Sequence, residues 1–155
     1  MHKILWLLLS LFILLLDQFT KYLAIHQLIL HQPHPITHFF NLTLAHNKGA
    51  AFSFLDHAGK NGVLFLTIFA ITMSIVLLIW LLRLPRKDSW LSMALALTLG
   101  GALGNLIDRL HYGYVVDFID IYKGQWHWPA FNIADSAICV GIIMLCLICT
   151  KKEQK

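Results

Sequence analysis

Four of the chain's seven aspartates lie in one stretch, residues 100–136, which apolar runs flank on both sides. They are Asp108, Asp117, Asp120 and Asp135, in a chain where only 13% of the residues are charged. An ionised carboxylate beside hydrocarbon is costly, so such a residue indicates a function and a partner. This stretch is therefore the first place to look for chemistry.

Two of these carboxylates, Asp117 and Asp135, have strongly apolar neighbours, in the sequences VVDF and FNIADSAI. Two acids held close together cannot both ionise readily, so one keeps its proton while the other can take a proton from water. This division of roles is the acid–base chemistry of an aspartic protease. Spacing alone leaves Asp120, three residues after Asp117, as a competitor for the same role.

Two asparagines accompany these acids at helical spacing. Asn132 precedes Asp135 by three residues and Asn105 precedes Asp108 by three, which places each pair on one helix face. We expect both asparagines to hydrogen-bond toward the site. The alternative is that they only join neighbouring helices, at about 0.6 kcal/mol per bond. Asp108 and its neighbour Arg109 are expected to form an ion pair that anchors the helix end.

The composition indicates a membrane protein. Hydrophobic residues make up 58% of the 155 residues, against roughly 45–50% in soluble domains, and the mean hydropathy is +0.69. The net charge of +4 does not indicate a nucleic-acid partner, because the basic residues stand in short clusters beside apolar runs. The three cysteines all lie in the last apolar run, where we expect them to pack as small residues: Cys139, Cys146 and Cys149.

Four apolar runs are long enough to cross a bilayer, at about residues 4–25, 62–82, 90–107 and 131–150. The first begins like a signal peptide, but no small-residue cleavage site follows it, so it is expected to be a retained span. As a helix it would be about 33 Å long. Asp17 and Lys21 are four residues apart in this run and can pair on one helix face.

The segment between the first two runs is predicted to form a small β-hairpin sheet on the membrane surface. Residues 36–45 alternate as a strand, Asn47-Lys48-Gly49 has the composition of a turn, and residues 50–54 can return as a second strand. The connection between the last two runs, residues 110–128, is expected to be a short aromatic loop that folds Asp117 back toward Asp135. The fold class is thus a mainly α membrane protein: four transmembrane helices with a small extracytoplasmic β-hairpin sheet, forming one domain over residues 1–155.

The basic residues predict the orientation. Seven of the twelve Lys and Arg residues fall on one side of a four-span arrangement, and three fall in the opposite loops. The positive-inside rule then places both termini in the cytoplasm and the aspartates near the outer leaflet.

Other chemistries are less well supported. The sequence HExxH is absent, and His31, His34 and His38 stand in a proline-broken segment without paired acids, so we expect no metal and no organic cofactor. No Gly-x-Ser-x-Gly sequence or reactive cysteine setting indicates nucleophilic catalysis. The alternative function is a small proton-coupled membrane transporter whose buried carboxylates relay protons, although inverted repeats are lacking. A non-enzymatic membrane scaffold is a third reading.

Five sequence blocks, in order along almost the whole chain, resemble those of the bacterial lipoprotein signal peptidase (signal peptidase II) family. They are DQFTK at residues 17–21, NKGAAFSFL at 47–55, GGALGNLIDR at 100–109, VVDFID at 115–120 and FNIADS at 131–136. Together they are highly specific, although any one alone is weak. The resemblance implies an aspartic endopeptidase of the bacterial inner membrane with four spans. It would remove the signal peptide of prolipoproteins, cutting just before a cysteine that carries diacylglycerol.

The resemblance also implies roles for single residues. Asp117 and Asp135 match the catalytic dyad of the family, which leaves Asp120 outside it. Asn47 and Gly49 match an outer-surface segment that contacts the substrate backbone. Asn105, Arg109 and Asn132 match polar residues that line the site in the family, and Arg109 would be a partner for the substrate main chain. Asp17 and Lys21 match the first block, whose role in the family is mainly structural.

The partners implied are a lipidated prolipoprotein, membrane lipids and globomycin-like inhibitors.

Overall fold

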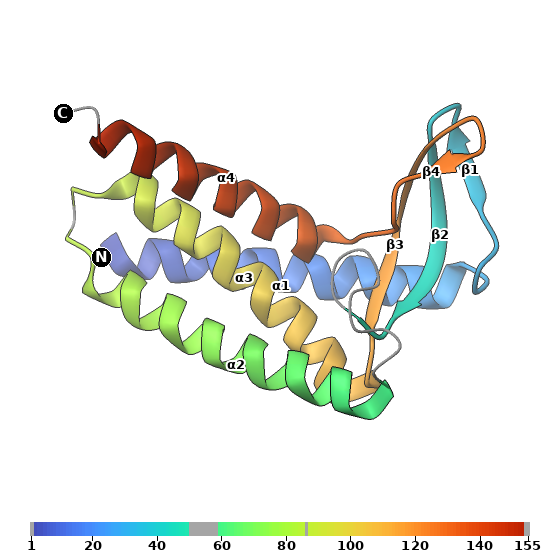
Figure 1. The fold of residues 1–155 in the computed structure, drawn as a ribbon, viewed down its shortest axis with the longest axis horizontal. Coiled ribbons are helices and arrows are strands. Elements are labelled where there is room, and N and C mark those ends of the chain that lie inside the picture. Colours follow the sequence, from blue (N-terminus) through green and yellow to red (C-terminus); the bar gives the residue numbers. More distant parts are fainter. Residues whose placement is uncertain (1, 50–58, 86, 154–155) are drawn as a thin grey trace.

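The computed structural model describes residues 2–49, 59–85 and 87–153. Within these residues the chain forms four long helices and one antiparallel sheet of four strands. All four helices are long and apolar enough to cross a membrane. The sheet lies at one end of the helices, and the start of the first helix and the end of the last lie at the other (Figure 1). The predicted fold class is confirmed.

The helices are α1 (His2–Gln27), α2 (Gly59–Arg83), α3 (Ser89–Tyr112) and α4 (Ile133–Glu153). The main difference from the predicted spans is at α3, which continues past residue 107 to Tyr112. The charged side chains of Asp108 and Arg109 do not end the helix, because both find partners within the protein. The helix ends where Gly113 adopts a φ of 76° and donates its N–H to the carbonyl of Arg109.

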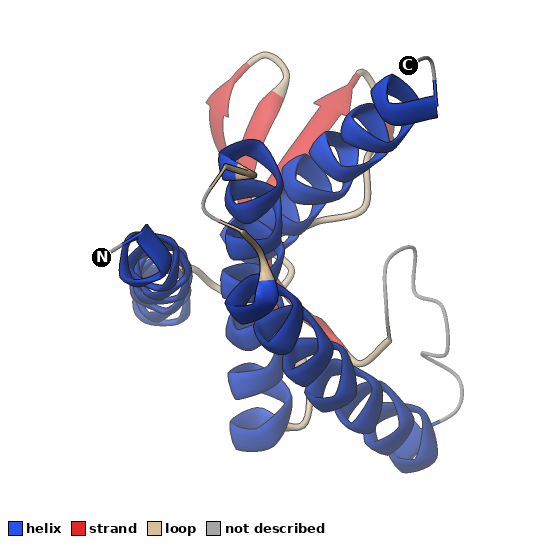
Figure 2. Ribbon diagram, turned by 90° about the vertical axis from the view of Figure 1, so that its left-hand side faces the viewer, coloured by secondary structure: helices blue, strands red, loops and turns tan. Residues whose placement is uncertain are grey.

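Helix α3 is the centre of the bundle and contacts each of the other three helices (Figure 2). Glycines on α3 make this close approach possible. A Cβ at Gly100 would collide with the backbone of Ser10 on α1, and a Cβ at Gly101 would collide with the carbonyl of Ala134 on α4. Small residues at helix interfaces are the usual means of close packing in membranes.

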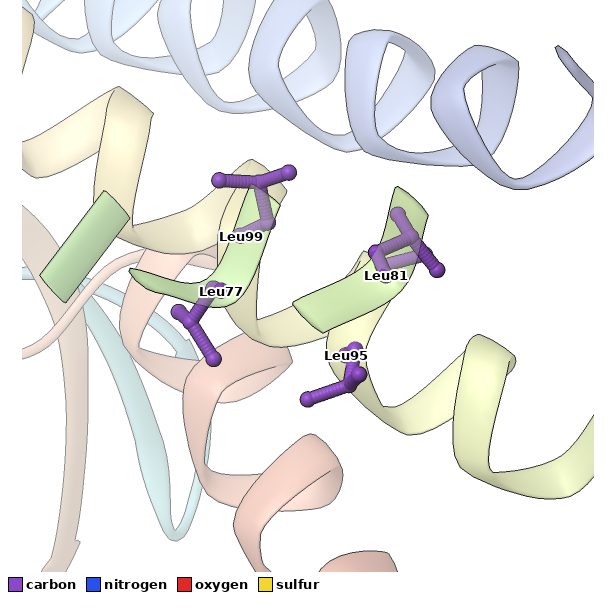
Figure 3. Close-up of a cluster of buried hydrophobic side chains, with 5 residues drawn as sticks. Leu77, Leu81, Leu95 and Leu99 are labelled. Carbon is purple, nitrogen blue, oxygen red and sulfur yellow. The ribbon is translucent and has the colours of Figure 1, made fainter. Parts of the chain in front are cut away.

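The contact between α2 and α3 is a leucine cluster. Leu77 and Leu81 of α2 interdigitate with Leu95 and Leu99 of α3, and all four are buried (Figure 3). The remaining faces of α2 expose apolar side chains such as Leu64 and Phe65, as expected for a helix that borders lipid.

The packing predicted for the three cysteines is wrong. Cys139, Cys146 and Cys149 are all exposed on the surface of α4. The reason is that α4 faces α3 through smaller residues, which include the buried Ala134 and the tightly packed Gly141. The cysteines therefore lie on faces of α4 that do not contact the bundle.

The sheet contains β1 (His34–Thr37), β2 (Phe40–Asn47), β3 (Val115–Lys123) and β4 (Trp126–His127), in that spatial order. The strand predicted at residues 36–45 is confirmed over residues 40–45, which lie in β2, but it is not one continuous strand, because the chain reverses at residues 38–39 and forms the β1–β2 hairpin. The predicted return strand at residues 50–54 lies outside the described residues.

The expectation of a loop over residues 110–128 is also wrong. Most of that segment is β3, which pairs with β2, and the β4 strand that follows it. Its run Val115-Val116-Asp117-Phe118-Ile119 is rich in β-branched and aromatic residues, which favour strands. Its partner, β2, lies about 70 residues earlier, as the pair Ala45 and Asp117 shows, so pairing over this distance has no local sequence pattern.

Candidate active site

Asp117 lies on β3, the strand that contacts α1 and α3, and it is paired in register with Ala45 of β2. Only 2% of its surface is exposed. Asn47 Nδ2 donates to Asp117 Oδ2 at 3.0 Å, and Asn132 Nδ2 donates to Asp117 Oδ1 at 2.7 Å. Both carboxylate oxygens are thus oriented by amide donors from other elements.

Asp135 lies in the first turn of α4 and is tied to the residue that precedes the helix. Its backbone N–H donates to Asn132 Oδ1 at 2.9 Å, while the Asn132 N–H donates to Asp135 Oδ2 at 3.3 Å. This reciprocal pair is a capping box, which satisfies two backbone donors at a helix start. Asn105 Nδ2 of α3 donates to the other oxygen of Asp135, Oδ1, at 2.7 Å.

Backbone pairing brings these two aspartates together. Phe131, just before the capping box, exchanges hydrogen bonds with Ile119 of β3 at 2.8 and 3.1 Å. The start of α4 is therefore held against the strand that carries Asp117. Asn132 bonds both aspartates. Its spacing from Asp135 had predicted a place on the same helix face, but Asn132 precedes α4 and is its N-cap.

The environment of Asp117 favours its neutral form. Burial, and next the negative charge of Asp135, raise the pKa of Asp117 from 3.8 to about 7. The hydrogen bonds from Asn47 and Asn132 and the charge of Lys21 act in the opposite direction but do not cancel the rise. A carboxyl that is partly protonated near neutral pH can exchange protons with water.

One cavity of about 760 Å³ opens beside both aspartates. Its polar end contains Asn47, Asn105 and Arg109, and its other wall consists of apolar residues on the outer face of α4. Five of the predicted site residues therefore line a single cavity: Asn47, Asn105, Arg109, Asp117 and Asp135.

Gly49 lies at the edge of this site. Its N–H donates to Asn47 Oδ1 at 2.9 Å, and its carbonyl accepts a hydrogen bond of 3.2 Å from Arg109 Nη2. The bond within Asn47-Lys48-Gly49 is an Asx turn, which confirms the predicted turn at these residues.

A charged cluster is buried behind the site, where Lys21 contacts both Asp17 and Asp108. Lys21 Nζ lies 2.8 Å from Asp17 Oδ2 and 2.9 Å from Asp108 Oδ2. We call these three residues the Lys21 cluster. The predicted pair of Asp17 and Lys21 is confirmed, but Asp108 pairs with Lys21 and not with Arg109. Consecutive residues on a helix diverge by about 100°, which sends Arg109 toward the cavity and Asp108 toward α1.

Asp120 faces a different part of the sheet. It accepts hydrogen bonds from Asn41 Nδ2 at 3.0 Å and from Thr43 Oγ1 at 3.3 Å, and His127 Nδ1 lies 2.9 Å from it. On a strand, residues three apart point to opposite faces, so Asp117 and Asp120 diverge. The structure thus separates the two acids that spacing alone did not rank.

Some residues at the cavity were not predicted, namely His46, Trp128 and Ser136. His46 stacks on Tyr114 with ring centroids 3.9 Å apart, and burial lowers its pKa. Only the position of β2 beside β3 reveals His46, because nothing in its neighbouring sequence indicates a site. Among the described residues, no group of three His, Cys, Asp or Glu side chains is arranged to hold a metal ion.

The fold and the site together define a multi-pass membrane protein with two carboxylates that line one cavity at one end of its helices. A solved structure described as a bacterial membrane enzyme has the same fold, with a TM-score of 0.85 and 33% identity, over 96% of this chain and 88% of that one. A second such structure matches with a TM-score of 0.80 and 34% identity, over 92% of this chain and 90% of the other.

The sequence comparisons identify the family. The family model of signal peptidase (SPase) II matches residues 9–151. A lipoprotein signal peptidase of Teredinibacter turnerae is 54% identical over 140 residues, which is 90% of this chain and 83% of the relative. One from Acinetobacter baumannii is 54% identical over 144 residues, or 93% of this chain and 82% of the relative. The chain belongs to the signal peptidase II family. These comparisons support the peptidase prediction, and nothing in them supports the transporter alternative.

Proposed function

We propose that this membrane peptidase removes the signal peptide from diacylglyceryl-modified prolipoproteins, cutting just before the lipidated cysteine, with Asp117 and Asp135 as its catalytic dyad. The observation that carries the proposal is the bridging of both carboxylates by Asn132 at the polar end of a cavity whose other wall is apolar. The name that the relatives share, lipoprotein signal peptidase, supports the same class of substrate.

The mechanism needs one proton shared by the dyad. The ionised carboxylate takes a proton from water as the water oxygen attacks the scissile carbonyl carbon, and the protonated partner donates its proton to the carbonyl oxygen. In the second step the carboxyl that gained the proton protonates the amide nitrogen, the other carboxylate takes a proton back from a hydroxyl of the tetrahedral intermediate, and the C–N bond breaks. The products are a new carboxyl terminus on the signal peptide and a free amine on the lipidated cysteine.

The cavity offers separate places for the peptide and the lipid of such a substrate. Asn47 and the Arg109–Gly49 contact lie beside the dyad, where polar groups can bind the substrate main chain. The apolar wall is formed by Ile138, Cys139, Val140 and Ile142 of α4. Because Cys139, Val140 and Ile142 are exposed on a membrane-spanning helix, acyl chains can lie against this wall without leaving the bilayer. A globomycin-like mimic of the lipidated substrate should compete for this space.

We place the protein in the bacterial inner membrane with both termini in the cytoplasm and the dyad near the outer leaflet. The uneven distribution of basic residues between the loops supports this orientation. The sheet and the dyad then belong to the outer side, since they lie at the helix ends opposite the start of α1 (Figure 1).

The test is cleavage of a purified lipidated prolipoprotein in detergent, followed by gel shift. Asp117→Asn and Asp135→Asn are nearly isosteric, and each should lower kcat by at least about 10²–10⁴-fold, the usual contribution of general acid–base catalysis. The double variant should be scarcely worse than either single one, because the two residues act as a unit. Asp120→Asn is the matched control and should keep most activity, and the wild-type protein should cleave in the presence of EDTA. Near wild-type cleavage by Asp135→Asn would show that the dyad mechanism is wrong.

A further inference from the structure

The ammonium group of Lys21 is buried and uses three acceptors. Besides the carboxylates of Asp17 and Asp108, it donates a hydrogen bond of 3.0 Å to Asn105 Oδ1. Only 2% of the surface of Lys21 is exposed. An ammonium group has three protons and no lone pair, so these three contacts use its full hydrogen-bonding capacity.

Each carboxylate of the Lys21 cluster also holds the backbone just before a dyad residue. Asp17 Oδ1 accepts the N–H of Ala134, the residue before Asp135, at 2.9 Å. Asp108 Oδ2 accepts the N–H of Val116, the residue before Asp117, at 3.0 Å. These two hydrogen bonds are alike, although one reaches α4 and the other reaches β3. One cation thus links the backbone supports of both aspartates.

The third acceptor connects Lys21 to the dyad side chains. Because Asn105 Oδ1 accepts a hydrogen bond from Lys21 Nζ, Asn105 turns its Nδ2 toward Asp135, to which it donates at 2.7 Å. The same Oδ1 accepts Asn132 Nδ2 at 3.2 Å, and this amide also donates to Asp117. The ammonium group of Lys21 cannot accept a hydrogen bond, so it fixes the donor and acceptor of each hydrogen bond that runs from Lys21 through Asn105 and Asn132 to the two aspartates.

We propose that the Lys21 cluster is the positioning device of the dyad, which sets the spacing and the shared charge of Asp117 and Asp135. The inference rests on the proposed function, since it assigns these aspartates to catalysis. It goes beyond a role in holding helices together, because a helix tie alone would affect the amount of folded protein and not the titration of the dyad.

The charges of the Lys21 cluster predict in which direction the pKa of Asp117 shifts when a member of the cluster is replaced. The cluster carries two carboxylates and one ammonium, a formal net charge of −1 if all are ionised. Among the described residues, the other charged or titratable groups around Asp117 are Asp135 of α4, Arg109 of α3 and His46 of β2, and they are the same in every variant below. Lys21 lowers the pKa of Asp117, so its removal should raise that pKa. Removal of one cluster carboxylate should lower it.

The experiment is a pH series of kcat/KM and kcat on purified protein, with lipidated prolipoprotein as substrate and activity expressed per folded molecule. Lys21→Met should lower kcat by about 10–100-fold, as misplaced catalytic groups do. It should leave KM nearly unchanged and move the alkaline limb of the profile up by as much as about one pH unit. Asp108→Asn should lower kcat and move that limb the opposite way. Ser10→Ala is the control, since it removes a buried hydrogen bond of α1 to Ala96 and should alter stability without moving the profile.

An unchanged rate and profile in folded Lys21→Met would overturn the inference, as would shifts of the same sign in Lys21→Met and Asp108→Asn. If Lys21→Met does not fold, Asp108→Asn alone decides by the direction of its shift. Failure of both variants to fold would also count against the inference, because the whole fold and not the dyad would then need the cluster. The proposed function fails separately, when Asp117→Asn or Asp135→Asn keeps its activity.

Discussion

Asn132 Nδ2 lies 2.7 Å from Asp117 Oδ1, and this hydrogen bond joins the start of α4 to β3. Asn132 is fully buried. Its amide nitrogen also donates to the carbonyl of Val116 at 3.2 Å, and its Oδ1 caps the helix that carries Asp135. A single side chain therefore combines a structural task, the helix cap, with a task in the site.

These two tasks of Asn132 can be separated by substitution. Asn132→Ser should keep most of the stability, because serine is also a good N-cap, but its hydroxyl is too short to replace the amide that reaches Asp117. We expect a loss of kcat of at least about 10-fold, as for a misplaced catalytic group. Asn132→Ala should lose the same activity and, in addition, about 0.5–2 kcal/mol of stability. Thermal unfolding and single-turnover cleavage measure the two effects. Full activity in Asn132→Ser would remove the bond to Asp117 from the mechanism.

The raised pKa of Asp117 predicts how stability depends on pH. Its pKa is about 7 in the folded protein against an ordinary value of 3.8, so between these values the folded state binds more protons than the unfolded state. The stabilising contribution of this proton is complete below about pH 3.8 and is lost as the pH rises to about 7. Asp117→Asn stays neutral throughout. Its Tm should exceed that of the wild type by an amount that grows from about pH 4 to about pH 7. A constant difference, or one that shrinks with pH, would contradict the prediction.

Gly101 marks a close approach of α3 to α4, next to the helix start that carries Asp135. A Cβ at this position would collide with the carbonyl of Ala134 and lie 2.8 Å from Ile138 Cγ1. Gly101→Ala should therefore destabilise the protein by about 1–3 kcal/mol and lower activity. In an uncrowded helix the same change would stabilise by as much as about 1 kcal/mol. The sign of the change in thermal stability in detergent thus decides whether the contact is as tight as the structure indicates.

The orientation in the membrane is tested with reporter fusions. A fusion at Lys87, between α2 and α3, should report a cytoplasmic position, and one at Gly124, between β3 and β4, should report an external one. The basis is the excess of Lys and Arg in loops at the same end of the bundle as the N-terminus. An external reporter at Lys87 would place the dyad on the cytoplasmic side and contradict the proposed location.

The sequence by itself determined the four spans and a short set of candidate acids, within which spacing did not rank Asp117 above Asp120. Length and hydropathy suffice for the spans, since a bilayer requires about 20 apolar residues whatever the neighbouring helices do. The aspartates could be recognised because carboxylates are rare in such surroundings, and the pairing of Asp17 with Lys21 followed from their spacing on one helix. These properties depend on residues that are near in sequence.

Only the tertiary structure decided what depends on distant partners. The segment predicted as a loop is the strand that carries Asp117, because it pairs with β2. Asp108 forms its ion pair with Lys21 of α1 and not with the neighbouring Arg109. Likewise, the cysteines of α4 became exposed because smaller neighbours occupy the interface with α3. In each case the neighbouring sequence did not distinguish between the possible contact partners. The choice between them was settled by the energy of burying one polar or apolar group against another, which a sequence pattern does not contain.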